Sequence, residues 1–346
     1  MKKFNLLSIL CAGIFTMLVT SCHNDPVSFP DFAYSTVFFA YQTPVRTIVL
    51  GDDTYDTSLD NAHKCEIYAT MGGVYANKKT INIDFVVDNT LCNDLNFSDA
   101  TPVTAMPASY YSLAGSKISL DHALQGAVGV QLNDAFFADP KALVNTYVIP
   151  LRMTNVVNAD SILSGTKKVA NAARLNPALW DIAPKDYVLY CIKFINPWHG
   201  NYLRRGKDVA TGSGLDTTLT YHQKYVEYDQ VVSMTSLSLN AVKVSLTTRN
   251  KGSLTNLPYD LQLNVDNAGK ITVANGGSTS PTYTVSGTGE YVTDGDMWGG
   301  IKRDVMRLSY QVNFTGVKPT THSFKDTIVI RDRGMKSETF VPFKYQ

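Results

Sequence analysis

The sequence has almost no net charge. In 346 residues, 31 lysines and arginines stand against 30 acidic residues, a formal net charge of +1. Proteins that bind nucleic acids usually need a clear basic excess for their phosphate contacts, so this balance argues against a nucleic-acid partner. Ordinary hydrophobicity, at 44% of residues, argues against wholesale disorder. At roughly 150 residues per domain, the length predicts about two folded domains.

Motifs for catalysis and for metal binding are also missing. The chain has no G-x-S-x-G, H-E-x-x-H, P-loop or C-x-x-C motif, and its six histidines are scattered without i, i+4 pairing. Glu290, Asp294 and Asp296 lie close in sequence, and two carboxylates about 5–9.5 Å apart could hydrolyse a glycosidic bond. A solvated turn is the alternative that we favour for this segment. The sequence therefore predicts no enzyme, no cofactor and no metal site.

An apolar run long enough to span a membrane comfortably is absent as well. The run over residues 4–19 is short and interrupted, follows two lysines and is typical of a signal peptide. It ends in Leu18-Val19-Thr20-Ser21-Cys22, which resembles a bacterial lipobox. We expect a lipoprotein signal peptide over residues 1–21, a diacylated Cys22 as lipid anchor, and a polar tether over residues 22–30. The alternatives are an ordinary signal peptide with a chance cysteine, or an uncleaved anchor.

Cleavage at this site changes the charge and the cysteine count. Two lysines leave with the signal, so the mature chain carries a net charge of −1. Cys11 leaves too and Cys22 is acylated, so Cys65, Cys92 and Cys191 remain. Either Cys65 and Cys92 form a disulfide in an exported protein, or all three are buried thiols. Each lies in or beside an apolar stretch, so we favour buried thiols.

The rest of the chain reads as short strands, which predicts an all-β protein. Strands at near-regular spacing over residues 31–155 predict a β-sandwich, and a meander over residues 185–346 predicts an antiparallel β-barrel or sandwich of lipocalin-like type. Residues 156–184 form the expected connector. Short helical segments are expected at residues 139–144, with Asp139 as N-cap, and at residues 169–175.

Segments in both halves resemble a known family. In the first half they are 85–91 (FVVDNTL), 106–113 (MPASYYSL), 147–151 (YVIPL) and 160–164 (DSILS), and in the second half 194–202 (FINPWHGNY), 204–208 (RRGKD), 286–289 (SGTG) and 329–333 (VIRDR). Their order resembles Bacteroidetes cell-surface lipoproteins that open with an Ig-like domain of unknown function. These proteins are encoded with SusC/SusD-type glycan-uptake systems and are similar in role to SusE/SusF-type glycan-binding lipoproteins.

The resemblance implies a function, a location and partners. It implies a non-catalytic protein of a polysaccharide-utilisation system that binds an oligosaccharide or polysaccharide. The protein would be lipid-anchored in the outer membrane at the cell surface, beside a SusC/SusD-like complex. The alternatives are a structural or adhesive lipoprotein that contacts host or fimbrial proteins, and an accessory to a glycoside hydrolase.

Candidate glycan-binding residues gather after the strand that ends near Ile195. Flat aromatic rings stack on sugar rings, while charged and amide groups pair with hydroxyls. Pro197 and Gly200 predict a turn here, where binding residues are common. The predicted set is Trp198, His199, Tyr202, Arg204, Arg205 and Asp208, with Trp298 from a second loop. The alternatives are that Trp198 plugs the core and that the Arg-Arg-Gly-Lys-Asp segment is an internal salt-bridge cluster.

Overall fold

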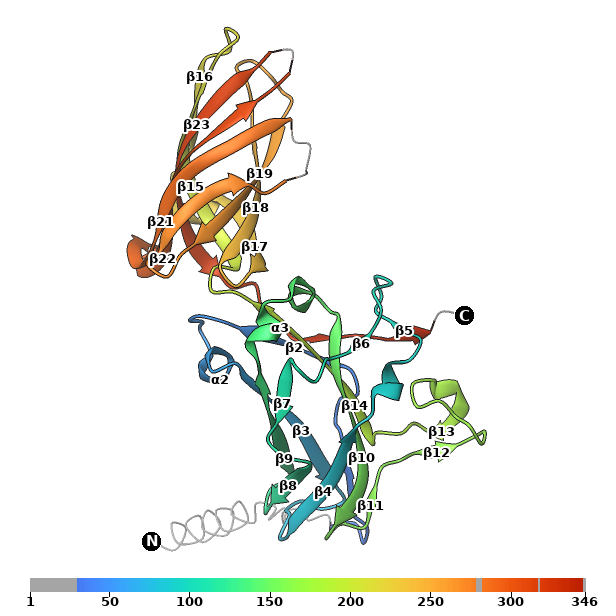
Figure 1. Ribbon diagram of the computed structural model, residues 1–346. Helices are drawn as coiled ribbons and strands as arrows, with labels where there is room; N and C mark the ends of the chain where they lie inside the picture. The colour runs from blue at the N-terminus through green and yellow to red at the C-terminus, as the bar shows by residue number, and fades with distance from the viewer. Residues whose placement is uncertain (1–29, 278–281, 317, 345–346) are drawn as a thin grey trace, which may run out of the picture.

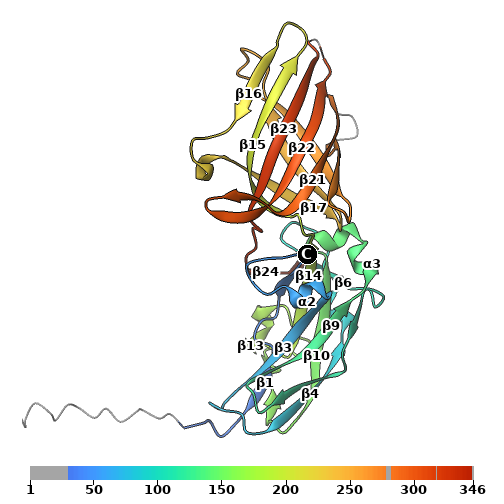
Figure 2. The same cartoon turned by 90° about the vertical axis from the view of Figure 1, so that its left-hand side faces the viewer.

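The computed structural model describes residues 30–277, 282–316 and 318–344 and is all-β, which confirms the predicted fold class (Figures 1 and 2). An N-terminal domain of two curled sheets is followed by a closed antiparallel barrel of eight strands. The predicted signal peptide, Cys22 and all but the last residue of the predicted tether lie outside the described residues. Among the residues described, no helix has both the length and the apolar character needed to cross a membrane.

The N-terminal domain consists of two main sheets. One sheet has the order β11 (Ser161–Ile162), β1 (Thr36–Phe38), β3 (Lys64–Gly72), β9 (Gln125–Leu132) and β7 (Tyr111–Leu113). The other has the order β24 (Glu338–Thr339), β2 (Pro44–Val49), β14 (Tyr187–Ile195), β10 (Tyr147–Val157), β4 (Thr80–Val87) and β8 (Lys117–Asp121), with β6 (Thr104–Ala105) beside β10. Two short ladders join β12 (Thr166–Lys167) to β13 (Trp180–Ile182), and β25 (Phe343–Lys344) to β5 (Leu95–Asn96).

The helical segments among the described residues are single turns. They are α2 (Ser58–Asn61), η1 (Asn89–Cys92), α3 (Asp134–Phe137), η2 (Pro140–Leu143), η3 (Pro177–Leu179) and η4 (Val226–Tyr228). The turn expected at residues 139–144 is confirmed as η2, where the Asp139 carboxylate accepts a hydrogen bond from the backbone N–H of Lys141 at 2.9 Å. The prediction of a helix at residues 169–175 is wrong. That segment is held instead by individual contacts: Arg174 pairs with Asp186, and Trp180 Nε1 donates to the carbonyl of Ala173.

The core of the N-terminal domain lies between its two main sheets and is apolar. Alternate residues of β3 point inward, including Ile67 and Ala69, and meet Ile83 and Ile149 from the facing sheet. The outer face of β10 and β14 is also covered, by residues 91–103 and by Phe340 near the C-terminus. Cys65, Cys92 and Cys191 are buried and free, which confirms the buried thiols and not the disulfide.

The chain passes between the two domains twice. It leaves the N-terminal domain after β14, runs through the barrel, and returns to add β24 beside β2 and β25 beside β5. The sheet order therefore places β14, which follows the predicted boundary at residue 184, with the N-terminal domain. Because both ends of the barrel segment are tied into one domain, the barrel is an insertion held at two points (Figure 1).

The barrel closes through pairing of its first and last long strands. Its strands are β15 (Gly200–Thr211), β17 (Gln230–Ser238), β18 (Ala241–Thr248), β19 (Leu257–Val265), β20 (Lys270–Asn275), β21 (Tyr283–Trp298), β22 (Ile301–Phe314) and β23 (Thr320–Asp332). β15 pairs with β23 over residues 201–211 and completes the cylinder. Along its other edge β15 pairs first with β17 and then with β16 (Thr217–Tyr221). A hairpin turn at residues 266–269 links β19 to β20.

The structure corrects one segment that bears on function. Residues 198–208 were expected to form a turn after a strand, but β15 begins at Gly200 and makes the segment a barrel strand. The polar residues of this segment hid the strand, because several of them point into the barrel and not to solvent. Within the predicted meander, the sequence pattern favours one strand over residues 217–228. In the structure that strand, β16, ends at Tyr221, and the following residues form a loop that contains η4.

Candidate functional site

Three of the seven predicted binding residues lie inside the barrel. Tyr202, Arg204 and Asp208 alternate along β15 and point inward, with exposed fractions of 1%, 0% and 0%. They are enclosed by side chains of the other strands. In this structure they offer no surface to a ligand outside the barrel.

Arg204 belongs to a buried ionic network. Its guanidinium pairs with the Asp326 carboxylate at 2.9 Å and lies 4.2 Å above the ring of Tyr221. The Tyr310 hydroxyl donates to the same carboxylate at 2.7 Å. Burial raises the pKa of Asp326 above its usual range, against the opposing attraction of Arg204. This arrangement agrees with the internal salt-bridge interpretation of this segment.

Asp208 belongs to a second buried network at the other end of β15. Its carboxylate contacts His322 Nδ1 at 2.8 Å and accepts from the Thr248 hydroxyl. His322 Nε2 lies 3.1 Å from the side-chain oxygen of Asn250. The interior of the barrel is therefore filled by aromatic rings and polar networks together.

Trp198 and His199 lie at the junction of the two domains. Trp198 is half-buried and packs edge-on against Tyr291, with ring centroids 6.2 Å apart. His199 Nδ1 accepts from the backbone N–H of Ser236 at 3.1 Å, so this nitrogen is unprotonated. Burial, together with the nearby Arg333 and Lys193, lowers the pKa of His199 to about 4. Both side chains belong to the joint between the domains.

Arg333 links the domains at this joint. Its guanidinium donates to the carbonyl oxygens of Leu50, Asp52, Asn196 and His199, at distances of 2.7–3.1 Å. A cleft of about 590 Å³ lies beside it, between residues 51–54 and the barrel end. Several charged groups of this cleft already have partners, since Asp304 accepts from Tyr291 and Arg303 donates to the backbone of β23. The cleft is consequently better explained as a structural joint than as a binding site.

The last two predicted residues come together on the outside of the barrel. The Arg205 guanidinium lies 4.8 Å from the ring centroid of Trp298 and is held by the buried carboxylate of Asp229. With Asp296, Met297 and Thr327, they line a groove of about 500 Å³. Trp298 comes from the tip of the β21–β22 hairpin, which folds over Leu203, Val305 and Val329. Packing therefore holds Trp298 in place at this groove, and the ion pair with Asp229 holds the Arg205 guanidinium in place.

The loop that contributes Val226 to this groove also carries two exposed tyrosines, which were not among the predicted binding residues. Tyr225 precedes η4 and Tyr228 is its last residue; they are 54% and 74% exposed, and their ring centroids lie 6.2 Å apart. Val226, between them in sequence, lines the groove and packs near Trp298. The loop that carries η4 and the β21–β22 hairpin lie on the same side of the barrel (Figure 2). The segment Tyr221-His222-Gln223-Lys224-Tyr225-Val226-Glu227-Tyr228 carries three tyrosines, a signal that could have marked it.

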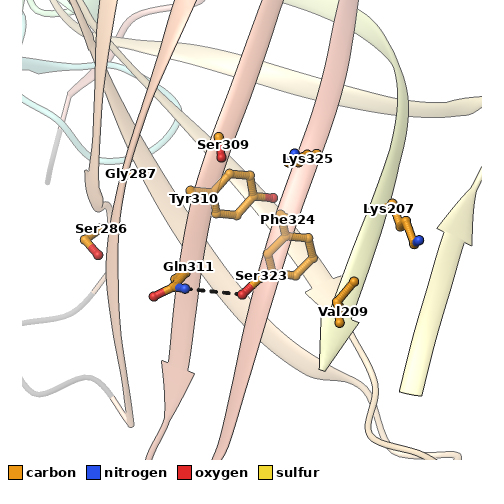
Figure 3. Close-up of a pocket in the computed structure, with 10 residues that line it drawn as sticks. All are labelled: Lys207, Val209, Ser286, Gly287, Ser309, Tyr310, Gln311, Ser323, Phe324 and Lys325. Carbon is orange, nitrogen blue, oxygen red and sulfur yellow. Dashed lines mark hydrogen bonds between the residues drawn. The ribbon is translucent and has the colours of Figure 1, made fainter. Parts of the chain in front are cut away.

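The outer wall of the barrel continues beyond this groove. A second hollow of about 650 Å³ shares Thr327 with it and includes Thr288, Glu290 and Arg307. A third, of about 610 Å³, shares Ser309 and Lys325 with the second. Figure 3 shows the residues of the third hollow on neighbouring strands, with Gln311 and Ser323 joined by a hydrogen bond of 3.3 Å. Short hydroxyl side chains form much of this wall.

The carboxylates considered for hydrolysis have other contacts. The Glu290 carboxylate pairs with Arg307 at 3.3 Å, and the Asp296 carboxylate accepts from the backbone N–H of Met297 at 2.8 Å. Asp294 is held through its backbone N–H, which donates to Asp304. Asp296 lines the groove beside Trp298. Within the described part of the chain, no group of three or more His, Cys, Asp or Glu side chains is placed to hold a metal ion.

Comparison with known proteins gives a family but no activity. A model described as a domain of unknown function (DUF5627) matches residues 197–334, and a model for an N-terminal domain matches residues 32–160. A crystal structure of a Bacteroides ovatus protein of unknown function is 40% identical, with a TM-score of 0.86, and the match covers 91% of this chain and 100% of that one. No curated protein matches the sequence.

Two further crystal structures show distant similarity. An auxiliary nutrient-binding protein from Bacteroides thetaiotaomicron is 12% identical, with a TM-score of 0.39, over 83% of this chain and 90% of that one. A protein from Bacteroides ovatus, provisionally described as carbohydrate-binding, is 13% identical, with a TM-score of 0.28, over 80% and 81% of the two chains. None of the three structures is described as an enzyme.

Proposed function

The chain belongs to the family of the Bacteroides ovatus protein of unknown function, so we propose its function from the groove itself. The protein binds a saccharide without transforming it. The site is the outer groove of the barrel between Tyr225, Tyr228, Arg205 and Trp298, which we name the tyrosine groove. The N-terminal domain acts as a spacer, and diacylated Cys22 anchors the protein at the outer-membrane surface, where it serves a SusC/SusD-type uptake complex.

The exposed tyrosine pair is the observation that carries this proposal. Large aromatic side chains are usually at least partly covered, because leaving them in water forfeits hydrophobic stabilisation. Two adjacent rings exposed beside a groove can stack on the C–H faces of sugar rings. Arg205, held in place by Asp229, offers donors to sugar hydroxyls from a preorganised position.

The groove is better suited to binding than to catalysis. Asp296 is its carboxylate, and Asp229 is occupied by Arg205 and by the backbone N–H of Gln223. A glycosidase needs a proton donor and a second carboxylate, each free to act on the bond. The residues that line this groove do not supply that pair.

Binding can be tested with the mature protein, with Cys22→Ser to remove the anchor. Affinity electrophoresis and calorimetry against a polysaccharide panel should detect at least one ligand. In the double variant Tyr225→Ala/Tyr228→Ala we expect affinity to fall by about tenfold or more. The melting temperature should stay the same, because exposed side chains contribute little to stability.

A matched control uses two exposed tyrosines of the N-terminal domain. Tyr41 and Tyr75 are 70% and 66% exposed, so Tyr41→Ala/Tyr75→Ala removes similar surface elsewhere. This variant should bind like the wild type. Absence of binding to every polysaccharide would overturn the proposal, as would equal losses in the two double variants. Released reducing sugar would show an enzyme instead.

A further inference from the structure

Two lysines face each other on the outer wall of the barrel. Lys207 of β15 and Lys325 of β23 are direct neighbours across the antiparallel ladder, and both are exposed. Like charges placed directly opposite on neighbouring strands destabilise a sheet. Neither lysine has an ion pair or hydrogen bond to any described residue. Folding alone gives no reason for this placement.

Elsewhere in the described ladders, two charged residues that lie directly opposite each other carry opposite charges. Lys117 lies opposite Asp84 and pairs with it at 2.9 Å. Glu290 lies between Arg307 on β22 and Lys270 on β20. Among the strand ladders described, Lys207 and Lys325 form the one directly opposed pair of like charges. This unusual pair therefore identifies the Lys207–Lys325 position as a candidate site for binding an anion.

The residues beside the two lysines are hydroxyls. Following the register across the strands, Lys207 is next to Thr220 on one side, and Lys325 is next to Ser309 on the other. Ser309 in turn lies opposite Thr288, and all three hydroxyl residues are exposed. This row has two positive charges and no carboxylate. It is continuous with the tyrosine groove, because neighbouring hollows share Thr327, Ser309 and Lys325.

We propose that Lys207 and Lys325 together bind the acidic group of an extended saccharide whose neighbouring rings lie in the tyrosine groove. The inference rests on the proposed function and names its ligand class: a polymer with carboxylate or sulfate groups, such as a uronate. An anion between the two ammonium groups relieves their repulsion, while the serine and threonine hydroxyls pair with sugar hydroxyls.

The test compares acidic and neutral polymers. Polygalacturonate, dextran sulfate, dextran and duplex DNA are titrated into the mature protein. We expect at least one acidic polysaccharide to bind about tenfold or more tightly than dextran. Lys207→Gln/Lys325→Gln should abolish that preference while raising or preserving the melting temperature, because it removes a repulsive pair. Polygalacturonate and dextran sulfate distinguish carboxylate from sulfate.

The control variant changes the net charge by the same amount but at another place on the surface. Lys78→Gln/Lys79→Gln removes two exposed lysines from the N-terminal domain and should leave binding unchanged. The inference is overturned if dextran binds as tightly as the acidic polymers, if the two lysine variants lose affinity equally, or if DNA binds as tightly as the acidic polysaccharides. Tyrosine-dependent binding of a neutral glycan would overturn this inference and leave the proposed function standing. No binding at all would overturn both.

Discussion

The two domains fill their interiors in different ways. The N-terminal domain packs apolar side chains between its sheets, as Ile83, Ile149 and Phe194 show. The barrel surrounds charged groups with aromatic rings, and Arg204 is its largest fully buried side chain. The stability of the N-terminal core depends on how well its apolar side chains pack and how much area they bury. The stability of the barrel interior depends on whether each buried charged group keeps its hydrogen-bond and ion-pair partners.

This difference has consequences for how each domain tolerates change. An apolar core loses stability in proportion to the volume removed and accepts substitutions of similar size. A buried ionic network is sensitive to the loss of one member, since the remaining charge is left without a partner. The barrel should therefore be the fragile domain, although it carries the proposed binding wall. Three predictions test this comparison.

The largest effect is expected for Arg204→Met. It leaves the Asp326 carboxylate buried without its cation, which typically costs about 3–5 kcal/mol in the free energy of unfolding. Hydrogen exchange during urea unfolding should place the loss in the barrel strands and not in the N-terminal sheets. Arg204→Met/Asp326→Leu should recover most of that stability, because no charge is left unpaired.

The control for this experiment lies in the apolar core. Ile83→Val removes one methylene and should cost about 0.5–1.5 kcal/mol, with its effect confined to the N-terminal sheets. If Arg204→Met costs no more than Ile83→Val, the barrel does not depend on its ionic network and the contrast between the two interiors is wrong.

A smaller effect is expected at the joint, for Arg333→Met. The substitution removes hydrogen bonds to four carbonyl oxygens from both domains, and we expect a loss of about 2–3 kcal/mol because water replaces part of them. Scattering in solution should show a wider range of domain orientations. If the variant shows the same coupling between the unfolding of the two domains as the wild type, the two connecting segments of the chain are sufficient to hold the domains together, and Arg333 is not needed for it.

The two interiors also explain how much the sequence could predict. Alternating apolar residues predicted most strands of the N-terminal domain, because its inward positions are apolar and its outward positions are polar. In β15 that rule fails, since Arg204 and Asp208 point inward and look like surface residues in the sequence. Because these inward positions are polar, the sequence predicted a binding turn where the structure has a barrel strand.

The candidate site was predicted in part for a similar reason. Arg205 and Trp298 were named as binding residues, and the structure brings them together from β15 and from the β21–β22 hairpin. That contact depends on closure of the barrel, which local sequence does not reveal. Tyr225 and Tyr228 were assigned to a strand, so their exposure went unrecognised. The Lys207–Lys325 pair depends on a register between strands more than a hundred residues apart.

The smallest predicted effect concerns pH and His199 at the joint. Its pKa is lowered from 6.5 to about 4 in the folded protein, so below pH 6.5 the unfolded chain binds a proton that the folded protein excludes. The contribution of neutral His199 to the free energy of unfolding is therefore fully present above pH 6.5, and it is lost as the pH falls towards 4. Between pH 7 and pH 5 we expect about 1–2 kcal/mol of the loss in unfolding free energy to come from this residue. His199→Gln should reduce the pH dependence by that amount. Equal pH dependence in the wild type and His199→Gln would show that the joint, like the apolar core, does not respond to protonation.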